Sequence, residues 1–298
     1  MPARIPCCPR GCRRCAIDWA PTARKTLGDR PVATHYIGGA VLRLPMDPSL
    51  RMNAPFPNPH SPGTRQPIFN LPPVITALIA LMLAIQAGQQ WLLSADAELQ
   101  VLLDFAFIPL RETHPDVFTG LVGFGEGARV WSFVTYALLH AGWAHVGLNC
   151  VWLAAFGSPV ARRFGTGRFL AFAAVGAVAG SALHLAVYPT SEVPLVGASA
   201  GISALMAGAA RFVFQSDGPM WSLGSFDAYR RPAAPLLALV RDSRVVVFLL
   251  VWFGTNIVFG LTGGAGVADG AVAWDAHIGG FVVGLLLFPL FDPVRAAR

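Results

Sequence analysis

Charged residues are scarce in this chain. Of its 298 residues, 13% are charged and 54% are hydrophobic. A soluble domain usually carries about 25% charged residues, so something other than water surrounds most of this chain. The net charge of +6 is compatible with nucleic-acid binding. The arginines, however, cluster in short segments between apolar runs, and this placement favours a protein in a lipid bilayer over one that binds nucleic acid.

Cysteine is also rare beyond the N-terminus. Of the five cysteines, only Cys150 lies in the apolar part of the chain, so no disulfide framework holds the core together. The other four are Cys7, Cys8, Cys12 and Cys15. Their spacing is irregular and no histidine lies nearby, which favours a basic tail; a zinc site is the alternative.

The sequence predicts two regions. Residues 1–67 are rich in proline and arginine and lack sustained apolar periodicity. They are too polar for a signal peptide and too proline-rich for a stable helix, so we expect a disordered cytoplasmic region there. A membrane domain is expected over residues 68–298. Because the composition changes near Met46 and Met52, one hypothesis is that translation begins at one of these methionines.

Apolar segments follow one another from Pro72 onward, each near the roughly 20 residues that a spanning helix needs. They cover about residues 73–93, 143–161, 168–188, 197–214, 244–262 and 273–291. The first loop, about residues 94–130, contains only short apolar pieces, which is typical of an amphipathic loop in the membrane interface. The sequence therefore predicts an all-α membrane protein, a bundle of six transmembrane helices.

Arginines in the loops predict the orientation of this bundle. One set of loops and the C-terminus carry Arg162, Arg163, Arg168, Arg230, Arg231, Arg241, Arg244, Arg295 and Arg298. Acidic residues dominate the other loops, at Asp96, Glu98, Asp104, Glu112, Asp116, Glu126, Glu192 and Asp269. Because arginine-rich loops stay on the cytoplasmic side, we expect both termini in the cytoplasm.

The second, fourth and sixth segments then enter the bilayer from the outer side, so polar residues in their first turns share one depth. The second brings His140, His145 and Asn149, the fourth brings Ser199, and the sixth brings His277. A serine in a membrane helix most often bonds to a carbonyl of its own helix. A cluster of polar groups in lipid, however, is costly unless it is partnered, and it indicates a functional site.

Peptide hydrolysis gives these side chains roles. Serine is a weak nucleophile that needs an adjacent base, and neutral His277 is suited to activate Ser199. The developing oxyanion needs fixed donors, which the backbone N–H of Ser199 and the side chains of His145 and Asn149 can supply. Asp275 is a candidate third member, but it would point to a different helix face from His277, so we favour a dyad.

Small residues would let the fourth and sixth segments approach closely. They recur at Gly197, Gly201, Ala204, Gly208, Gly280 and Gly284. Such packing would bring Ser199 within hydrogen-bond reach of His277.

At these residues the sequence resembles the rhomboid family of intramembrane serine proteases. The resemblance rests on His140-x4-His145-x3-Asn149, on Gly197-Ala198-Ser199, and on Ala276-His277-x2-Gly280-x3-Gly284. It covers about residues 70–291. Three departures from the family pattern are Ala200 directly after the serine, Ser203 where many members have an aromatic residue, and Trp131-Ser132 in place of a Trp-Arg pair.

The resemblance implies a serine endopeptidase that cuts membrane proteins in or next to their transmembrane segments. Ser199 would be the nucleophile and His277 the base, with His145 and Asn149 supporting the oxyanion and His140 close to the site. No metal or organic cofactor is implied. The partners would be transmembrane substrates and the bilayer, and the location would be a bacterial inner membrane, with the active site towards the outer face.

Rhomboids are thought to open between the second and fifth segments, where Trp252 and Phe253 could form a gate. One alternative is a rhomboid-like protein that binds client transmembrane helices without cutting them. Another is a transporter or channel, to which His184 would contribute; we expect His184 instead to be a packing histidine.

Overall fold

The computed structural model describes residues 26–27, 30–37, 40–45, 71–121, 127–215, 229–262 and 272–294. The chain divides into two compact units, Met1–Gln66 and Pro67–Arg298, each of which is described here by itself.

The first unit contains three short antiparallel strands in sequential order. They are β1 (Thr26–Leu27), β2 (Arg30–Ile37) and β3 (Ala40–Pro45). The sequence predicts no regular structure in this region. For the rest of residues 1–67 the expectation of disorder stays a prediction. Cys7, Cys8, Cys12, Cys15, Met46 and Met52 lie outside the described residues.

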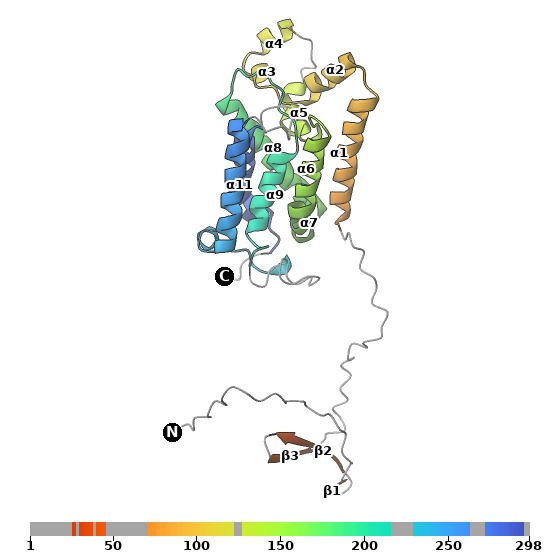
Figure 1. The fold of residues 1–298 in the computed structure, drawn as a ribbon, viewed down its shortest axis with the longest axis vertical. Helices are drawn as coiled ribbons and strands as arrows, with labels where there is room; N and C mark the ends of the chain where they lie inside the picture. The colour runs from red at the N-terminus through yellow and green to blue at the C-terminus, as the bar shows by residue number, and fades with distance from the viewer. Residues whose placement is uncertain are drawn as a thin grey trace. The chain divides into compact units, whose positions relative to one another are not determined.

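The second unit is a bundle of helices (Figure 1). Its main helices are α1 (Pro73–Trp91), α6 (Trp143–Trp152), α7 (Ser158–Phe164), α8 (Thr166–Val187), α9 (Ser199–Ala210), α11 (Ser243–Thr262) and α12 (Trp274–Phe291). A π-helical turn, Leu153–Gly157, joins α6 to α7. The shorter elements are α2 (Ala95–Phe105), α3 (Pro109–Thr113), α4 (Pro115–Leu121), α5 (Ala128–Thr135), the 3-10 turn Tyr136–Leu138, and α10 (Leu236–Leu239).

Within the described residues, four helices are long and apolar enough to cross a membrane: α1, α6 with α7, α8 and α12. The prediction of an all-α membrane bundle is confirmed, while the count of six spans stays a prediction. The fourth segment yields only the 12 residues of α9, a length of roughly 18 Å. Every residue from Ala200 to Ala210 is buried, so α9 is surrounded by protein and its backbone needs no lipid-spanning length.

Small residues pack α9 against α8 and α12. A Cβ added at Gly284 of α12 would lie 2.5 Å from Cα of Ala204, and one at Gly280 would collide with the carbonyl of Ala200. The prediction that Gly280 and Gly284 bring these helices together is therefore confirmed. Gly201 was assigned to the same contact, but it faces the carbonyl of Ala173 on α8, because it lies on another side of α9.

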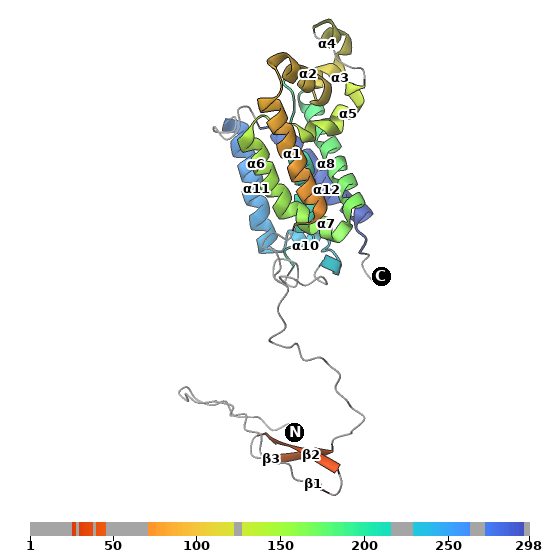
Figure 2. The same ribbon diagram turned by 90° about the vertical axis from the view of Figure 1, so that its right-hand side faces the viewer.

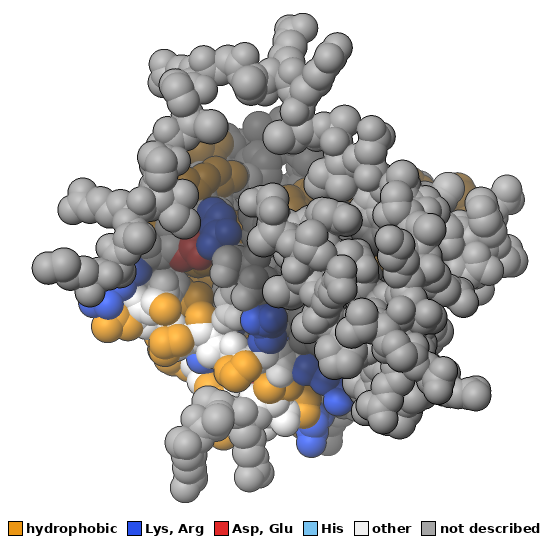
Figure 3. Space-filling view, turned by 90° about the horizontal axis from the view of Figure 1, so that it is seen from below, with side chains coloured by type: hydrophobic (Ala, Val, Ile, Leu, Met, Phe, Trp, Pro, Cys, Tyr) orange, Lys and Arg blue, Asp and Glu red, His pale blue; other side chains and the backbone are white. Residues whose placement is uncertain are grey.

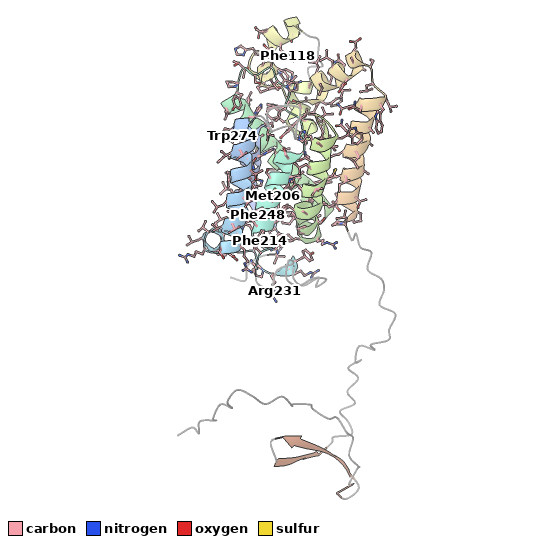
Figure 4. All side chains as sticks on the ribbon, in the orientation of Figure 1. Phe118, Met206, Phe214, Arg231, Phe248 and Trp274 are labelled. Atoms are coloured by element: carbon pink, nitrogen blue, oxygen red, sulfur yellow. The ribbon has the colours of Figure 1, made fainter. Side chains whose placement is uncertain are left out.

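The two ends of the bundle differ in charge. The helices α2 to α5 gather at one end, which we call the loop end (Figures 1 and 2). At the opposite end, the arginine end, lie α7 and α10 (Figure 2). The segments in and next to the end of α7, the start of α8, α10 and the start of α11 carry Arg162, Arg168, Arg230, Arg231, Arg241 and Arg244. Figure 4 shows Phe118 at the loop end and Arg231 at the arginine end. Seen from below in Figure 3, the described surface carries basic side chains among hydrophobic ones.

A buried guanidinium ties the arginine end together. Arg163 forms a two-pronged ion pair with Asp292, with both N–O distances 2.8 Å. It also donates to the backbone carbonyls of Tyr229 and Arg231. The end of α7, the loop before α10 and the end of α12 are therefore joined by one side chain.

A second buried guanidinium, that of Arg111, organises the loop end. It donates to the carbonyls of Leu103 and Ala106 and to Oγ of Ser132, the last at 2.7 Å. Ser132, where the sequence departs from the Trp-Arg pair, thus accepts a hydrogen bond from an arginine elsewhere in the loop. That this loop lies in the membrane interface stays a prediction.

Candidate active site

Ser199 and His277 meet near the loop end. Ser199 is the first residue of α9, and His277 lies in the first turn of α12. Oγ of Ser199 is 2.7 Å from Nε2 of His277. The contact joins residues 78 positions apart, and it depends on the close packing of α9 against Gly280.

The turn before Ser199 requires a glycine. Gly197 has φ of +116°, a conformation that side chains other than glycine rarely adopt. Its N–H donates to the carbonyl of Tyr136 at 3.0 Å. Two residues earlier, Leu195 exchanges backbone hydrogen bonds with Phe107 of the first loop. The first loop therefore fixes the backbone that leads into Ser199.

The residue after the serine needs no such freedom. Ala200 is buried, and its Cβ packs against Gly180 of α8. The special backbone angle falls at Gly197 and not at Ala200, so alanine at this position is compatible with a helix that begins at Ser199.

Asn256 of α11 fixes the imidazole of His277, a role that the sequence reasoning missed. Oδ1 of Asn256 lies 2.5 Å from Nδ1 of His277, while Nδ2 of Asn256 donates to the carbonyl of Trp252. Because Oδ1 can only accept, Nδ1 carries the proton and Nε2 presents its lone pair to Ser199. The signal available in the sequence was a lone amide, Asn256, within the apolar run of α11.

Ser203 has a different partner from the one that its position suggests. Its Oγ donates to the carbonyl of Ser199 at 2.8 Å. The imidazole of His277 is thus held from α11 by Asn256, and not by a residue one turn along α9.

Asp275 is bonded to another histidine. Its Oδ2 lies 2.7 Å from Nδ1 of His184, so the carboxylate belongs to a contact between α12 and the end of α8. The structure places His184 as a buried, hydrogen-bonded residue, in agreement with the expectation of a packing histidine, and its partner is the carboxylate of Asp275.

His145 and Asn149, both on α6, lie beside Ser199 and His277. A Cβ added at Gly197 would lie 2.7 Å from Nε2 of His145 and 3.8 Å from Oγ of Ser199, so the imidazole edge reaches the turn before the serine. Nδ1 of His145 accepts from the N–H of Ala141 at 3.5 Å, which leaves Nε2 as a donor. Asn149 is buried, and its amide donates one hydrogen to the carbonyl of His145. The second amide hydrogen is left to donate to another group.

His140 supports this pair from behind. Its ring meets that of His145 edge to face, with the centroids 5.1 Å apart. His140 is buried, and within the described residues it is His145, and not His140, that lines the cavity beside Ser199.

A cavity of about 670 Å³ connects these groups. Its wall contains Ser199, His277, His145, Asn149 and Asn256. Apolar side chains of α6, the π-helical turn after it, α9 and α11 line much of the rest, among them Trp152, Phe156, Met206, Phe248 and Trp252. Figure 4 labels Met206 and Phe248 from this wall. The cavity is large enough for several residues of an extended chain and mostly apolar, which suits a segment drawn from a membrane helix.

Aromatic contacts close the gap between α6 and α11. Phe156 and Phe248 lie with their ring centroids 5.3 Å apart across it. Trp252 and Phe253, which the sequence suggests as a gate, both pack on Phe281 of α12, with centroids 4.6 and 5.7 Å apart. That they form a gate stays a prediction. That these residues contact α12 depends on how α11 is rotated about its axis. The sequence alone does not give this rotation.

Comparisons with known proteins agree with this architecture. A family model described as the rhomboid domain matches residues 127–292. Rhomboid-related protein 3 of Homo sapiens is 35% identical over 100 residues, which are 33% of this chain and 24% of that protein. The rhomboid protease GlpG of Serratia proteamaculans is 26% identical over 160 residues (53% of this chain, 47% of that protein). GlpG of Pectobacterium atrosepticum is 29% identical over 164 residues (55% and 49%). The chain thus spans from about a quarter to about half of the length of these relatives.

Proposed function

We propose, starting from the fact that the chain belongs to the rhomboid family, that it is an intramembrane serine endopeptidase with a Ser199–His277 dyad. The observation that carries the proposal is the 2.7 Å contact between Oγ of Ser199 and Nε2 of His277 at the wall of a mostly apolar cavity. A hydroxyl and a correctly protonated imidazole in contact form the minimal unit of nucleophilic serine catalysis.

The reaction follows from these two atoms. Oγ of Ser199 attacks the scissile carbonyl carbon, its proton passes to Nε2 of His277, and the carbonyl π electrons move onto oxygen. When the tetrahedral intermediate collapses, the C–N bond breaks and the amine nitrogen takes the proton from His277. A water molecule then repeats the attack on the acyl-enzyme ester, loses a proton to His277, and releases the acid as Ser199 regains its hydrogen.

Donors around Ser199 would stabilise the oxyanion. Ser199 begins α9, where backbone N–H groups have no partner within the helix. Nε2–H of His145 and the remaining amide hydrogen of Asn149 come from the facing helix α6. Donors fixed in a mostly apolar cavity stabilise a developing charge more than they would in water.

The substrates proposed are transmembrane proteins cut in or beside their membrane segments. The apolar wall between α6 and α11 suits such a segment, and Phe156 and Phe248 lie where it would enter. We further propose that the arginine end faces the cytoplasm, because basic loops are retained on that side. The dyad would then lie towards the outer face of a bacterial inner membrane.

Cleavage of a purified single-span substrate tests the proposal. The full chain in detergent should cut it, whereas Ser199→Ala and His277→Ala should each lose nearly all activity, since removing either half disables the unit. Ser203→Ala is the matched control, because it removes a hydroxyl one turn along α9 that does not contact His277. It should retain most of the activity.

Other outcomes distinguish the alternatives. Unchanged cleavage by Ser199→Ala would falsify the assignment of the nucleophile. Binding of the substrate by the wild-type protein without any cleavage would instead support a rhomboid-like protein that holds client helices.

A further inference from the structure

We propose that His184, Asp275 and Tyr188 form a cation-binding subsite of the cavity, which receives a lysine or arginine side chain of the substrate close to the bond that is cut. The inference rests on the proposed function, and it deepens that function by naming a property of the substrate. It begins with a buried pair that the Ser199–His277 reaction does not use.

The pair joins two helices at the cavity wall. Oδ2 of Asp275, near the start of α12, lies 2.7 Å from Nδ1 of His184, in the last turn of α8. Asp275 is 1% exposed, and its Oδ1 has no hydrogen-bond partner within the described part of the chain. Both residues line the cavity that contains Ser199. When His184 is neutral, a buried carboxylate with only this partner leaves negative charge uncompensated.

No basic side chain in the described cavity wall balances that charge. Among the described lining residues, Asp275 is the one carboxylate, and neither lysine nor arginine occurs. The other titratable side chains of this wall are His145, His184, His277 and Tyr188. In a largely apolar cavity a charge acts over a longer distance than in water. The cavity therefore favours a substrate group that carries positive charge.

His184 supplies the acceptor atom of the subsite. Asp275 accepts from Nδ1–H of His184, so the neutral imidazole keeps the lone pair of Nε2 as an acceptor. A lysine ammonium or an arginine guanidinium is the donor that such an acceptor, backed by a carboxylate, binds most strongly.

An aromatic ring completes the subsite. The ring of Tyr188 lies 5.3 Å from that of His184, centroid to centroid, and both residues line the cavity. Tyr188 is 42% exposed, so a cation that approaches His184 can also lie over its ring. Cation–π contact is favourable for both lysine and arginine.

Substrate scanning with wild-type and variant protein tests the subsite. A single-span substrate carries lysine, glutamine or glutamate at each position in turn on both sides of the cleavage site. We expect one position at which lysine raises kcat/KM over glutamine by roughly tenfold, about the effect of one hydrogen bond to a charged group, while glutamate lowers it. In Asp275→Asn this ratio of lysine to glutamine should fall towards one.

Two further variants separate recognition from folding. Tyr188→Leu should reduce the ratio by a smaller factor, and Tyr188→Phe, which keeps the ring, should retain it. Because Tyr188 is partly exposed, these variants keep the test decisive if Asp275→Asn does not fold. Direct binding of the lysine and glutamine substrates to Ser199→Ala measures the same preference without turnover.

Each outcome decides one claim. Cleavage without preference for lysine at any position would overturn the subsite and leave the protease intact. An unchanged ratio in Asp275→Asn, or an equal loss on all substrates, would also overturn it, since the pair would then only position α12. If the wild-type protein cuts nothing, the proposed function fails. The binding comparison on Ser199→Ala alone then decides whether the cation-binding subsite exists.

Discussion

Asn256 and His277 share a hydrogen bond of 2.5 Å between Oδ1 and Nδ1. The amide comes from α11, whereas Ser199 comes from α9, so three helices must be in place before the imidazole presents its lone pair. The second hydrogen bond of Asn256, to the carbonyl of Trp252, prevents the amide from turning over. A side chain that fixes the tautomer of a general base raises the fraction of protein that is competent to react.

Replacing this amide should slow catalysis without abolishing it. In Asn256→Ala, we expect kcat to fall by roughly 10- to 100-fold, by analogy with the loss of a group that orients a metal-bound histidine, with a smaller change in KM. Steady-state kinetics on the single-span substrate measure both. Ile257→Ala, at an exposed neighbouring position of the same helix, should leave kcat within about twofold of wild type. Wild-type turnover in Asn256→Ala would show that His277 is oriented by other contacts.

Loss of an oxyanion donor gives the second prediction. Asn149→Ala should lower turnover by up to roughly 100-fold, since one donor of this kind contributes on that order. Specific activity and folded yield should both be measured, because Asn149 is also buried. A larger fall in folded yield than in specific activity would mean that Asn149 acts as a packing residue.

Close packing of α9 on α12 gives the third prediction. Gly280→Ala places a methyl group against the carbonyl of Ala200, so the helices must separate, at a cost of about 1–3 kcal/mol. Thermal unfolding in detergent should show a lower midpoint, and cleavage should fall with it. The matched control is Gly254→Ala on α11, where an added Cβ has nothing within 4 Å. Equal midpoints for the two variants would count against this packing.

Two ion pairs near the arginine end give the fourth prediction. Asp292→Asn removes the buried partner of Arg163, whose side chain is 0% exposed, and should cost about 3–5 kcal/mol. Asp242→Asn removes the partly exposed partner of Arg244, which through its hydrogen bond lowers the pKa of Asp242. It should lower stability much less than Asp292→Asn, because exposed ion pairs contribute little. The two midpoints in thermal unfolding test this order, and the reverse order would contradict it.

The helical membrane architecture was predictable because long apolar runs and arginine-bearing loops depend on local composition. The contacts of Gly280 and Gly284 were also predictable, because a spacing of four residues places both on one face of a helix. The length of α9 was not: the apolar run at 197–214 includes Gly197, with its positive φ, and ends beyond the last helical residue, Ala210. Hydropathy records no backbone turn.

The site shows the same division. Helix parity brought Ser199, His145 and His277 to one depth in the sequence reasoning, and the structure places all three around one cavity. The partners of His277 and His184 were not predictable. The direction in which Asn256 and Asp275 point depends on how α11 and α12 are rotated about their axes. A shift by one residue would turn each side chain to another side of its helix.

Covalent labelling of the nucleophile tests the central claim most directly. The full chain is treated with a fluorophosphonate, which reacts with activated serines, and the modified residue is located by mass spectrometry. The account predicts one adduct, on Ser199, that is absent in Ser199→Ala and strongly reduced in His277→Ala. Labelling of another serine while Ser199 stays unmodified, or equal labelling of Ser199 with and without His277, would contradict it.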